Sequence, residues 1–279
     1  MIELPESYVI VSQINESLAG KVIRRVTANT RQHKFAAFSG DPDLYEASLS
    51  GKSVIKASLG SDETGGSLVT ILCGDMLLIM NTSIRYHAPD EEVAPIHQLL
   101  IEFSDASKMS CVVQIWGSML CVPAGDSGKF DISYSGANLS PLEDAFNMQY
   151  YMDIFRYAKP SLSAKAFLTT ELRFPGIGNG VMHDILFNAR IHPKRKISTY
   201  SIINKERLFH SIKSTLRYMA ERGGRDTEVD LFGNRGGYKT ILSSKSAGLP
   251  CRNCRSQIAK EMFLGGHIYY CPECQPMNE

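Results

Sequence analysis

Four cysteines near the C-terminus constrain this chain more than any other feature. Cys251, Cys254, Cys271 and Cys274 form the pattern C-x2-C-x16-C-x2-C. Two C-x2-C pairs at this separation can place four thiolates around one tetrahedral Zn²⁺. Four unrelated thiols and a redox pair are the alternatives, but a redox C-x2-C would lie beside a βαβ pattern and would not be duplicated. The spacing therefore predicts one bound zinc ion.

The segment around these cysteines has few aliphatic residues to fold it. It carries Gly265, Gly266, Tyr269, Tyr270 and Pro272 instead. Metal binding must then supply much of its folding free energy. Because no fifth ligand accompanies the four thiolates, we expect a closed site, which makes the zinc structural and not catalytic.

Charge is distributed unevenly along the chain. The net charge is only +1, but residues 1–150 carry 10 Lys+Arg against 18 Asp+Glu, and residues 151–279 carry 20 against 11. A basic half that ends in a zinc module favours nucleic acid as the partner. A chance distribution of solvated charges is the alternative.

The composition is that of an ordinary soluble protein. With 279 residues, 43% of them apolar, the chain can bury two cores. It has no apolar run long enough to span a membrane, and the N-terminus has neither a basic region nor an apolar signal core. We expect a cytoplasmic or nuclear monomer that binds no membrane and no small-molecule cofactor; a bacterial chain would be nucleoid-associated.

Periodicity changes along the chain. The pattern predicts a helix over 5–19, and then strands over 22–28, 53–59, 67–73, 76–81, 98–104 and 109–122. After Pro141 it predicts helices over 142–158, 161–172, 179–190 and 204–222, the last capped by Asn204 and ended by Gly223-Gly224. A glycine-rich loop over 223–240 precedes the cysteines.

This order predicts an α+β fold with three domains. An antiparallel β-sandwich with a flanking helix would occupy 1–140. A helical domain would occupy 141–240, and a four-cysteine zinc hairpin would occupy 241–279.

The sharpest motif of the helical half is Pro175-Gly176-Ile177-Gly178-Asn179. Glycines on both sides of Ile177 permit positive φ and a close backbone approach. A helix that starts at Asn179 would direct N–H groups and a positive dipole end outward, which suits a phosphate. A tight corner between two helices is the alternative.

Several motifs together resemble one family. They are Glu3-Leu4-Pro5-Glu6, Gly176-Ile177-Gly178-Asn179, Ala189-x-Ile191-His192-Pro193, Gly223-Gly224, and Tyr270-Cys271-Pro272-x-Cys274-Gln275. In order and spacing they resemble the formamidopyrimidine-DNA glycosylase / endonuclease VIII family of base-excision DNA repair. The resemblance implies a β-sandwich and a helix–two-turns–helix domain with a zinc finger, which bind damaged DNA in the cleft between them.

The resemblance also implies chemistry at the N-terminus. In the family, an N-terminal proline exposed by loss of the initiator Met attacks the anomeric carbon below a damaged base and forms a Schiff base. The next residue, a glutamate, handles protons, and elimination cuts the strand. Glu3 matches that glutamate and Glu6 matches the second acidic position. The amine would belong to Met1 if it is retained, or to Ile2.

Three positions depart from the family pattern. Ile2 stands where the family has proline, and a bulky residue there favours retention of Met1. The stretch Leu59-Gly60-Ser61-Asp62 lacks the catalytic hairpin Lys. The hairpin residues 264–268 lack the phosphate-binding Arg, and His267 is the nearest polar substitute.

Other residues are candidates for DNA contact. Trp116 lies where the family inserts an aromatic wedge, although a core tryptophan in an apolar strand is equally consistent. Lys194-Arg195-Lys196 would contact phosphate beside Gly178 and Asn179, or would form a solvated turn. Lys239 would face the pocket for an extruded base.

Three functions remain open. The first is a DNA glycosylase/AP lyase that acts on damaged or abasic duplex DNA and uses an N-terminal amine with Glu3. The second is a catalytically silent relative that binds damaged DNA as a recognition or regulatory module. The third is a zinc-ribbon protein that binds RNA or a protein, and it leaves the N-terminal motif unexplained.

Overall fold

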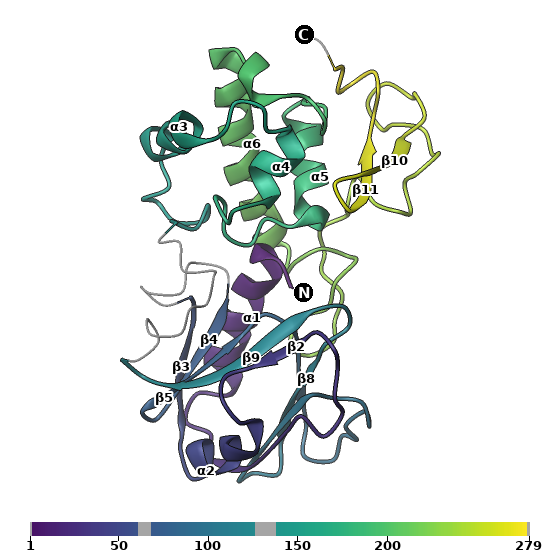
Figure 1. The fold of residues 1–279 in the computed structure, drawn as a ribbon. Coiled ribbons are helices and arrows are strands. Elements are labelled where there is room, and N and C mark those ends of the chain that lie inside the picture. The colour runs from purple at the N-terminus through teal and green to yellow at the C-terminus, as the bar shows by residue number, and fades with distance from the viewer. Residues whose placement is uncertain (1, 61–67, 126–137, 278–279) are drawn as a thin grey trace. The chain divides into compact units, whose positions relative to one another are not determined.

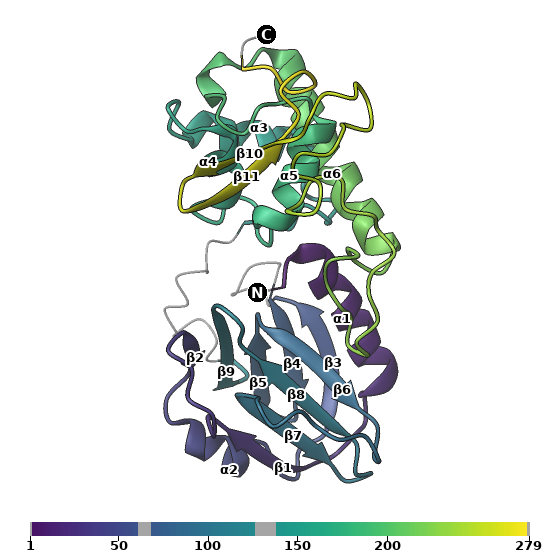
Figure 2. The same cartoon turned by 90° about the vertical axis from the view of Figure 1, so that its right-hand side faces the viewer.

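The computed structural model describes residues 2–60, 68–125 and 138–277. It forms two compact units, Met1–Ala137 with Gly223–Gly236, and Asn138–Arg222 with Gly237–Glu279 (Figures 1 and 2). The predicted three-domain division stays a prediction, although the helices and the four-cysteine hairpin share a unit. Within the described ranges, no helix is long and apolar enough to cross a membrane.

The first unit contains the predicted β-sandwich. One sheet has the strand order β1-β7-β8-β6 and the other β2-β9-β5-β4-β3. All neighbours pair antiparallel except β2 and β9, which are parallel. The strands are β1 (Ile23–Ala28), β2 (Ala36–Phe38), β3 (Val54–Leu59), β4 (Val69–Cys73), β5 (Met76–Met80), β6 (Ser83–His87), β7 (Leu99–Phe103), β8 (Lys108–Val112) and β9 (Gly117–Pro123).

Helix α1 (Leu4–Ser17) packs against β3 and β4 of this sandwich. Ile10, Ile14 and Leu18 are buried in the core with strand residues from both sheets. Glu3 is the N-cap residue of α1 and Pro5 lies in its first turn, where a missing N–H costs nothing. The residues of this first turn, Leu4, Pro5, Glu6 and Ser7, are buried. The short helices η1 (Pro42–Leu44) and α2 (Tyr45–Leu49) complete the unit, and α2 packs on β1.

The apolar run 109–122 is two strands and not the single strand predicted. β8 pairs with β6 and β7 in one sheet, whereas β9 pairs with β5 and β2 in the other. Residues 113–116 carry the chain across the sandwich, and Gly117 begins β9 where a Cβ would lie 2.8 Å from Thr82 Cβ. Because both strands are buried, the sequence shows one continuous apolar pattern.

The second unit contains the predicted helices and hairpin. The elements are α3 (Met148–Tyr157), α4 (Ala164–Thr169), α5 (Asn179–Asn188), η3 (Ile197–Thr199), α6 (Ile202–Glu221), β10 (Ala259–Phe263) and β11 (Gly266–Tyr270). The N-cap of α6 is Ser201, and Asn204 occupies N3 of a capping box with it, so the predicted cap at Asn204 was wrong. Asn204 Oδ1 accepts from Ser201 N at 3.1 Å instead.

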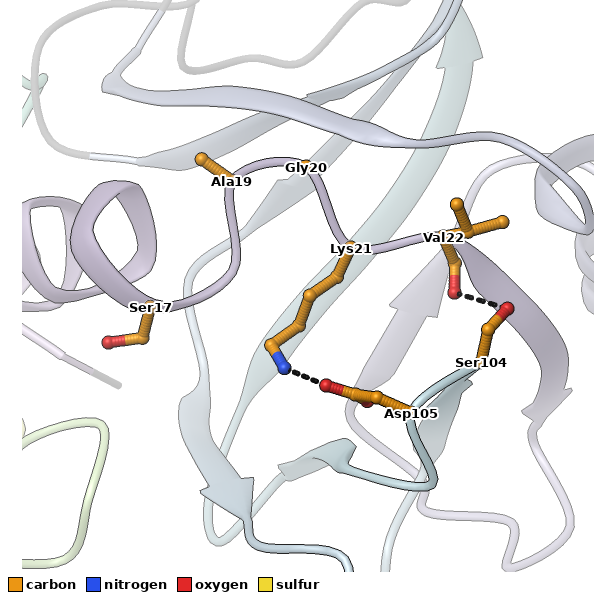
Figure 3. A pocket seen from close by; sticks show the side chains of 7 residues that line it. All are labelled: Ser17, Ala19, Gly20, Lys21, Val22, Ser104 and Asp105. Atoms are coloured by element: carbon orange, nitrogen blue, oxygen red, sulfur yellow. Dashed lines mark hydrogen bonds and ion pairs between the residues drawn. The ribbon is translucent and has the colours of Figure 1, made fainter.

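An open hollow of about 520 Å³ lies at the C-terminal end of α1 (Figure 3). Lys21 and Asp105 form an ion pair across it, and Ser104 Oγ donates to the Val22 carbonyl at 3.3 Å. The hydrogen bonds from Lys21 and Ser107 lower the pKa of Asp105 to about 2. The hollow lies about 20 Å along the helix from Glu3, since each residue adds about 1.5 Å. It is therefore separate from the N-terminal carboxylates.

Candidate functional site

The four cysteines converge as the spacing predicted. Their Sγ atoms all lie within 4.8 Å of one another, with Cys251–Cys274 at 3.8 Å and Cys254–Cys271 at 3.3 Å. A tetrahedral zinc with Zn–S of about 2.3 Å separates its sulfur ligands by about 3.8 Å. The donor set and its dimensions therefore fit a structural Zn²⁺ with four thiolate ligands.

The cysteine hairpin is fixed to the turn that follows α5. Gln275 Nε2 donates to the Ile191 carbonyl at 2.9 Å, and Gln275 Oε1 accepts from Cys271 N at 3.0 Å. The His192 and Tyr270 rings lie 4.2 Å apart between centroids. Two motifs distant in sequence, Ile191-His192 and Tyr270 to Gln275, thus form one interface within the second unit.

The start of α5 meets the turn of the hairpin. Asn179 is exposed, and Gly178 is the N-cap and offers no side chain to cap the helix. A Cβ placed on Gly266 would lie 3.5 Å from Asn179 Nδ2 and 3.7 Å from Lys165 Nζ. Lys165 is only 3% exposed, donates to the Phe263 carbonyl at 2.7 Å, and has its pKa lowered by burial. An amide, an ammonium group and a helix N-terminus converge here, which suits an anion.

Only one of the two glycines in this corner uses its conformational freedom. Gly176 has φ +75°, whereas Gly178 has φ −103°, which any residue can adopt. The positive φ that the two glycines permit is therefore used at Gly176 and not at Gly178.

The three basic residues predicted to contact phosphate have different surroundings. Arg195 is buried and donates to Asn204 Oδ1 at 2.9 Å and to the Thr199 carbonyl at 3.1 Å. Lys194 forms an ion pair with Glu261. Lys196 is exposed. Phosphate contact stays a prediction for all three, and Lys196 is the only one of the three that is exposed.

The N-terminal carboxylates gather around one buried arginine in the first unit. Arg225 donates from Nε and Nη2 to the two Glu6 oxygens at 3.0 and 2.8 Å, and its backbone N donates to Glu6 Oε1 at 3.1 Å. Arg225 Nη1 lies 3.5 Å from Glu3 Oε2. Burial alone would lower the pKa of Arg225, but Glu3 and Glu6 raise it well above its ordinary value. Burial also raises the pKa of the neighbouring Glu228.

Ile2 packs against the sandwich core and is partly buried. Met1 and the predicted hairpin positions Ser61 and Asp62 lie outside the described residues. An apolar anchor therefore occupies the position at which the resemblance expects a proline nucleophile.

The remaining candidates for DNA contact lie on separate elements. Trp116 is half-buried, and its neighbour Ile115 is 78% exposed between β8 and β9. His267 is exposed on β11, with its ring 6.4 Å from Tyr269. Lys239 is exposed beside an open hollow of about 400 Å³ that Arg222 and Arg252 also line. Their contact with DNA stays a prediction.

Sequence reasoning missed Arg225 and Ile115. An arginine directly after Gly223-Gly224 was a signal, since two glutamates in the N-terminal turn need a cation if buried. Ile115 was obscured because residues 109–122 were treated as one strand.

No family model matches the chain. It is similar to formamidopyrimidine-DNA glycosylases of Enterococcus faecalis (24% identical over 285 residues, 100% of this chain and 98% of that protein) and Symbiobacterium thermophilum (28% over 290 residues, 100% and 90%).

Among solved structures it is similar to the MutM (Fpg) protein of Thermus thermophilus, with TM-score 0.81, 19% identity, and 99% and 100% of the two chains covered. It is also similar to Lactococcus lactis Fpg crystallised with abasic-site DNA, with TM-score 0.83, 18% identity, and 98% and 99% covered. Over its full length, in sequence and in fold, this chain therefore resembles the formamidopyrimidine-DNA glycosylases.

Proposed function

We propose that this protein binds damaged or abasic duplex DNA and releases the damaged base, as a DNA glycosylase of the formamidopyrimidine type. One observation carries the DNA-binding part: Asn179, Lys165 and the hairpin turn at Gly266 converge at the start of α5. A phosphate bound there would accept hydrogen bonds from groups that the fold holds in place. One protein with this fold, the Lactococcus lactis Fpg, was crystallised with N7-benzyl-Fapy-dG DNA and with abasic-site DNA.

The four cysteines would hold one structural Zn²⁺ in this proposal. The ion would fold the hairpin and thereby place the turn at Gly266 against Asn179 and Lys165. It takes no part in base release, since four thiolates leave no open coordination position.

Glu3 would handle protons during base release. Its carboxylate is near Arg225 and its side chain is 12% exposed, so a substrate atom can reach it. With Ile2 packed on the core, we expect the amine-dependent strand cleavage to be weak. A displacement of about 1 Å from the reactive geometry can cost about a hundredfold in rate.

A catalytically silent DNA-binding protein is the second candidate, and the packing of Ile2 favours it. The two candidates share the DNA contacts and differ only in base release.

Three assays on the same lesion-bearing duplexes separate these possibilities. The duplexes carry a formamidopyrimidine, an oxidised pyrimidine or an abasic site, with undamaged DNA and Glu3→Gln protein as controls. Base release that Glu3→Gln abolishes supports the glycosylase. Selective binding without base release supports the silent protein. Equal binding to damaged and undamaged DNA without base release contradicts both.

Borohydride trapping on abasic DNA tests the amine separately. We expect little trapped adduct, and Ile2→Pro protein, with mass spectrometry of its N-terminus, is the matched variant. Efficient trapping by the unaltered protein would contradict the weak-cleavage expectation.

A further inference from the structure

Residues 223–236, named here the return segment, lie along helix α1. Glu6 and Gln13 are seven residues apart and thus lie on one face of the helix, about two turns apart. Glu6 contacts Arg225, as described above. Gln13 Nε2 donates to Asp230 Oδ2 at 2.8 Å, and Gln13 Oε1 accepts from Leu231 N at 3.0 Å. The return segment is thus held on α1 at two separate places.

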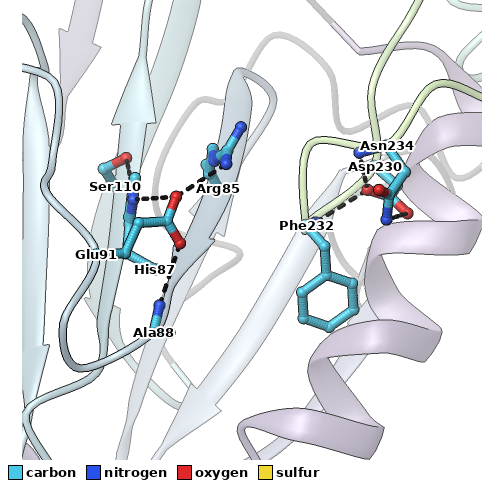
Figure 4. Close-up of polar contacts among 8 residues, drawn as sticks. All are labelled: Arg85, His87, Ala88, Glu91, Ser110, Asp230, Phe232 and Asn234. Carbon is cyan, nitrogen blue, oxygen red and sulfur yellow. Dashed lines mark hydrogen bonds and ion pairs between the residues drawn. The ribbon is translucent and has the colours of Figure 1, made fainter.

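The far end of the return segment is also fixed on the sheet. Tyr86 N of β6 donates to the Leu231 carbonyl at 2.8 Å, and the Leu231 side chain is fully buried in the core. Asp230 Oδ1 accepts from Phe232 N and Asn234 N at 2.9 and 2.8 Å, which closes a tight turn near Arg85 (Figure 4). This end therefore has its own anchors, independent of Arg225.

The near end depends on Arg225. Arg225 is 3% exposed and Glu6 2% exposed, so neither charge has water as an alternative partner. Two guanidinium N–H groups and the backbone N–H are directed to Glu6, and Nη1 is directed to Glu3. Because the guanidinium is planar and rigid, Glu6 fixes the plane in which Nη1 meets Glu3.

The Glu3 side chain does not cap the helix that it begins. Glu3 is the N-cap residue of α1, but its side chain makes no capping hydrogen bond. An ordinary N-cap side chain is directed at the N–H groups of its own helix. The Glu3 carboxylate is instead near a cation that belongs to the return segment.

We propose that Arg225 is a positioning residue that orients the Glu3 carboxylate and couples it to the return segment. The inference rests on the proposed function, because that function assigns Glu3 the proton transfer. In this arrangement Glu6 orients Arg225, and Arg225 orients Glu3. The proposed phosphate contacts at Asn179, Lys165 and the hairpin belong to the other unit, so we expect DNA affinity to be unaffected by changes at Arg225.

The test compares two ends of the same segment. Arg225→Lys keeps the charge but loses the planar fork. In the double variant Glu6→Gln/Arg225→Gln, two amides can still bond while both charges are absent. The matched control, Gln13→Met, removes only the hydrogen bonds of Gln13 to Asp230 Oδ2 and Leu231 N and leaves Arg225 and Glu6 unaltered. Single-turnover base release, DNA affinity and melting temperature are measured for each.

We expect base release to fall about a hundredfold in both Arg225 variants, as for about 1 Å of displacement, with DNA affinity unchanged. Gln13→Met should keep the unaltered rate. Equal loss of rate in Gln13→Met and Arg225→Lys would mean that docking of the segment matters and Arg225 does not position Glu3. A normal rate in Arg225→Lys would also overturn the proposal.

Hydrogen exchange keeps the inference testable if the unaltered protein releases no base. That result would refute the proposed glycosylase activity but would leave the coupling of Arg225 to the first turn of α1 to be tested. In Arg225→Lys, amides at residue 225 and in the first turn of α1 should exchange about tenfold faster, while Leu231 stays protected. Unchanged exchange at residue 225 and the first turn of α1 would show that Arg225 does not couple them.

Discussion

The two units differ in how closely they follow the glycosylase pattern. In the second unit, the Gly178-Asn179 turn, Ile191-His192 and the cysteine hairpin are all present and contact one another. In the first unit the carboxylates Glu3 and Glu6 are present, but Ile2 replaces the nucleophile. The difference teaches that the proposed DNA-binding surface and the N-terminal carboxylates are built from separate contacts, so one can change while the other persists.

The largest expected effect is that of removing a zinc ligand, which should alter the second unit and leave the first unchanged. Cys251→Ser or Cys274→Ser should unfold the hairpin, because a structural zinc in finger peptides contributes about 10–16 kcal/mol at neutral pH. Zinc content should fall from about one per chain, and DNA binding should be lost. Cys111→Ser, which alters a buried thiol of the sandwich, is the control and should retain zinc. Full DNA affinity in the zinc-free variants would show that the hairpin of the second unit is not needed for DNA binding.

The second effect is confined to the first unit. Glu6→Leu leaves the buried Arg225 charge without its main partner, which should cost about 3–5 kcal/mol of unfolding free energy. Glu6→Leu combined with Arg225→Met should recover most of that loss. Urea unfolding gives both values, and zinc content should stay constant. If the double variant were no more stable than Glu6→Leu, the ion pair would not be the cause.

A third effect concerns DNA affinity alone. Asn179→Ala and Lys165→Met should each weaken duplex binding about tenfold, equivalent to about 1.4 kcal/mol, without a change in the stability of the first unit. Lys196→Gln should lower the slope of affinity against salt by about one phosphate contact. Fluorescence anisotropy at several salt concentrations provides the measurement. Lys159→Gln is the control, because Lys159 is an exposed lysine that is not among these proposed phosphate contacts. An equal loss of affinity in Lys159→Gln would mean that only the net positive charge of the protein matters.

The smallest expected effect is the pH dependence of the stability of the first unit. His87 is 4% exposed, and its Nε2 lies 2.8 Å from Ser110 Oγ. Burial lowers the pKa of His87, and the positive charges of Arg85 and Lys108 lower it further, whereas Glu91 raises it. The unfolded chain then binds more protons than the folded one just below pH 6.5. Stability should therefore decline as pH falls from about 6.5. His87→Gln should decline less over this window in thermal melts, and identical slopes would rule His87 out.

Much of this architecture could be predicted from the sequence, because its signals are local. Apolar alternation located the main strands, and cysteine spacing located the hairpin. Strands β2 and β6 were not predicted, because β2 is only three residues long and β6 is half polar. The cap of α6 was misplaced by three residues, because Ser201 and Asn204 are both good capping residues and form one box.

The sites were less predictable, because their contacts are distant in sequence. Arg225 and Glu6 are 219 residues apart, and Lys165 and Phe263 are 98 apart. A single sequence gives no signal for such pairs beyond residue type. The resemblance supplied Glu3, Glu6 and Asn179, but it could not supply Arg225, whose role depends on burial.

The backbone crossing between Gly224 and Gly236 has a consequence for how variation in this protein is interpreted. A Cβ on Gly236 would lie 2.1 Å from the Gly224 carbonyl oxygen. Gly236 itself has no side chain and touches no carboxylate, yet even alanine there would displace the residue that precedes Arg225. The conservative substitution Gly236→Ala would thus disturb the hydrogen bond between Arg225 N and Glu6 by displacing the main chain at Gly224. Only glycine, which has no Cβ, fits at position 236 without moving the main chain at Gly224.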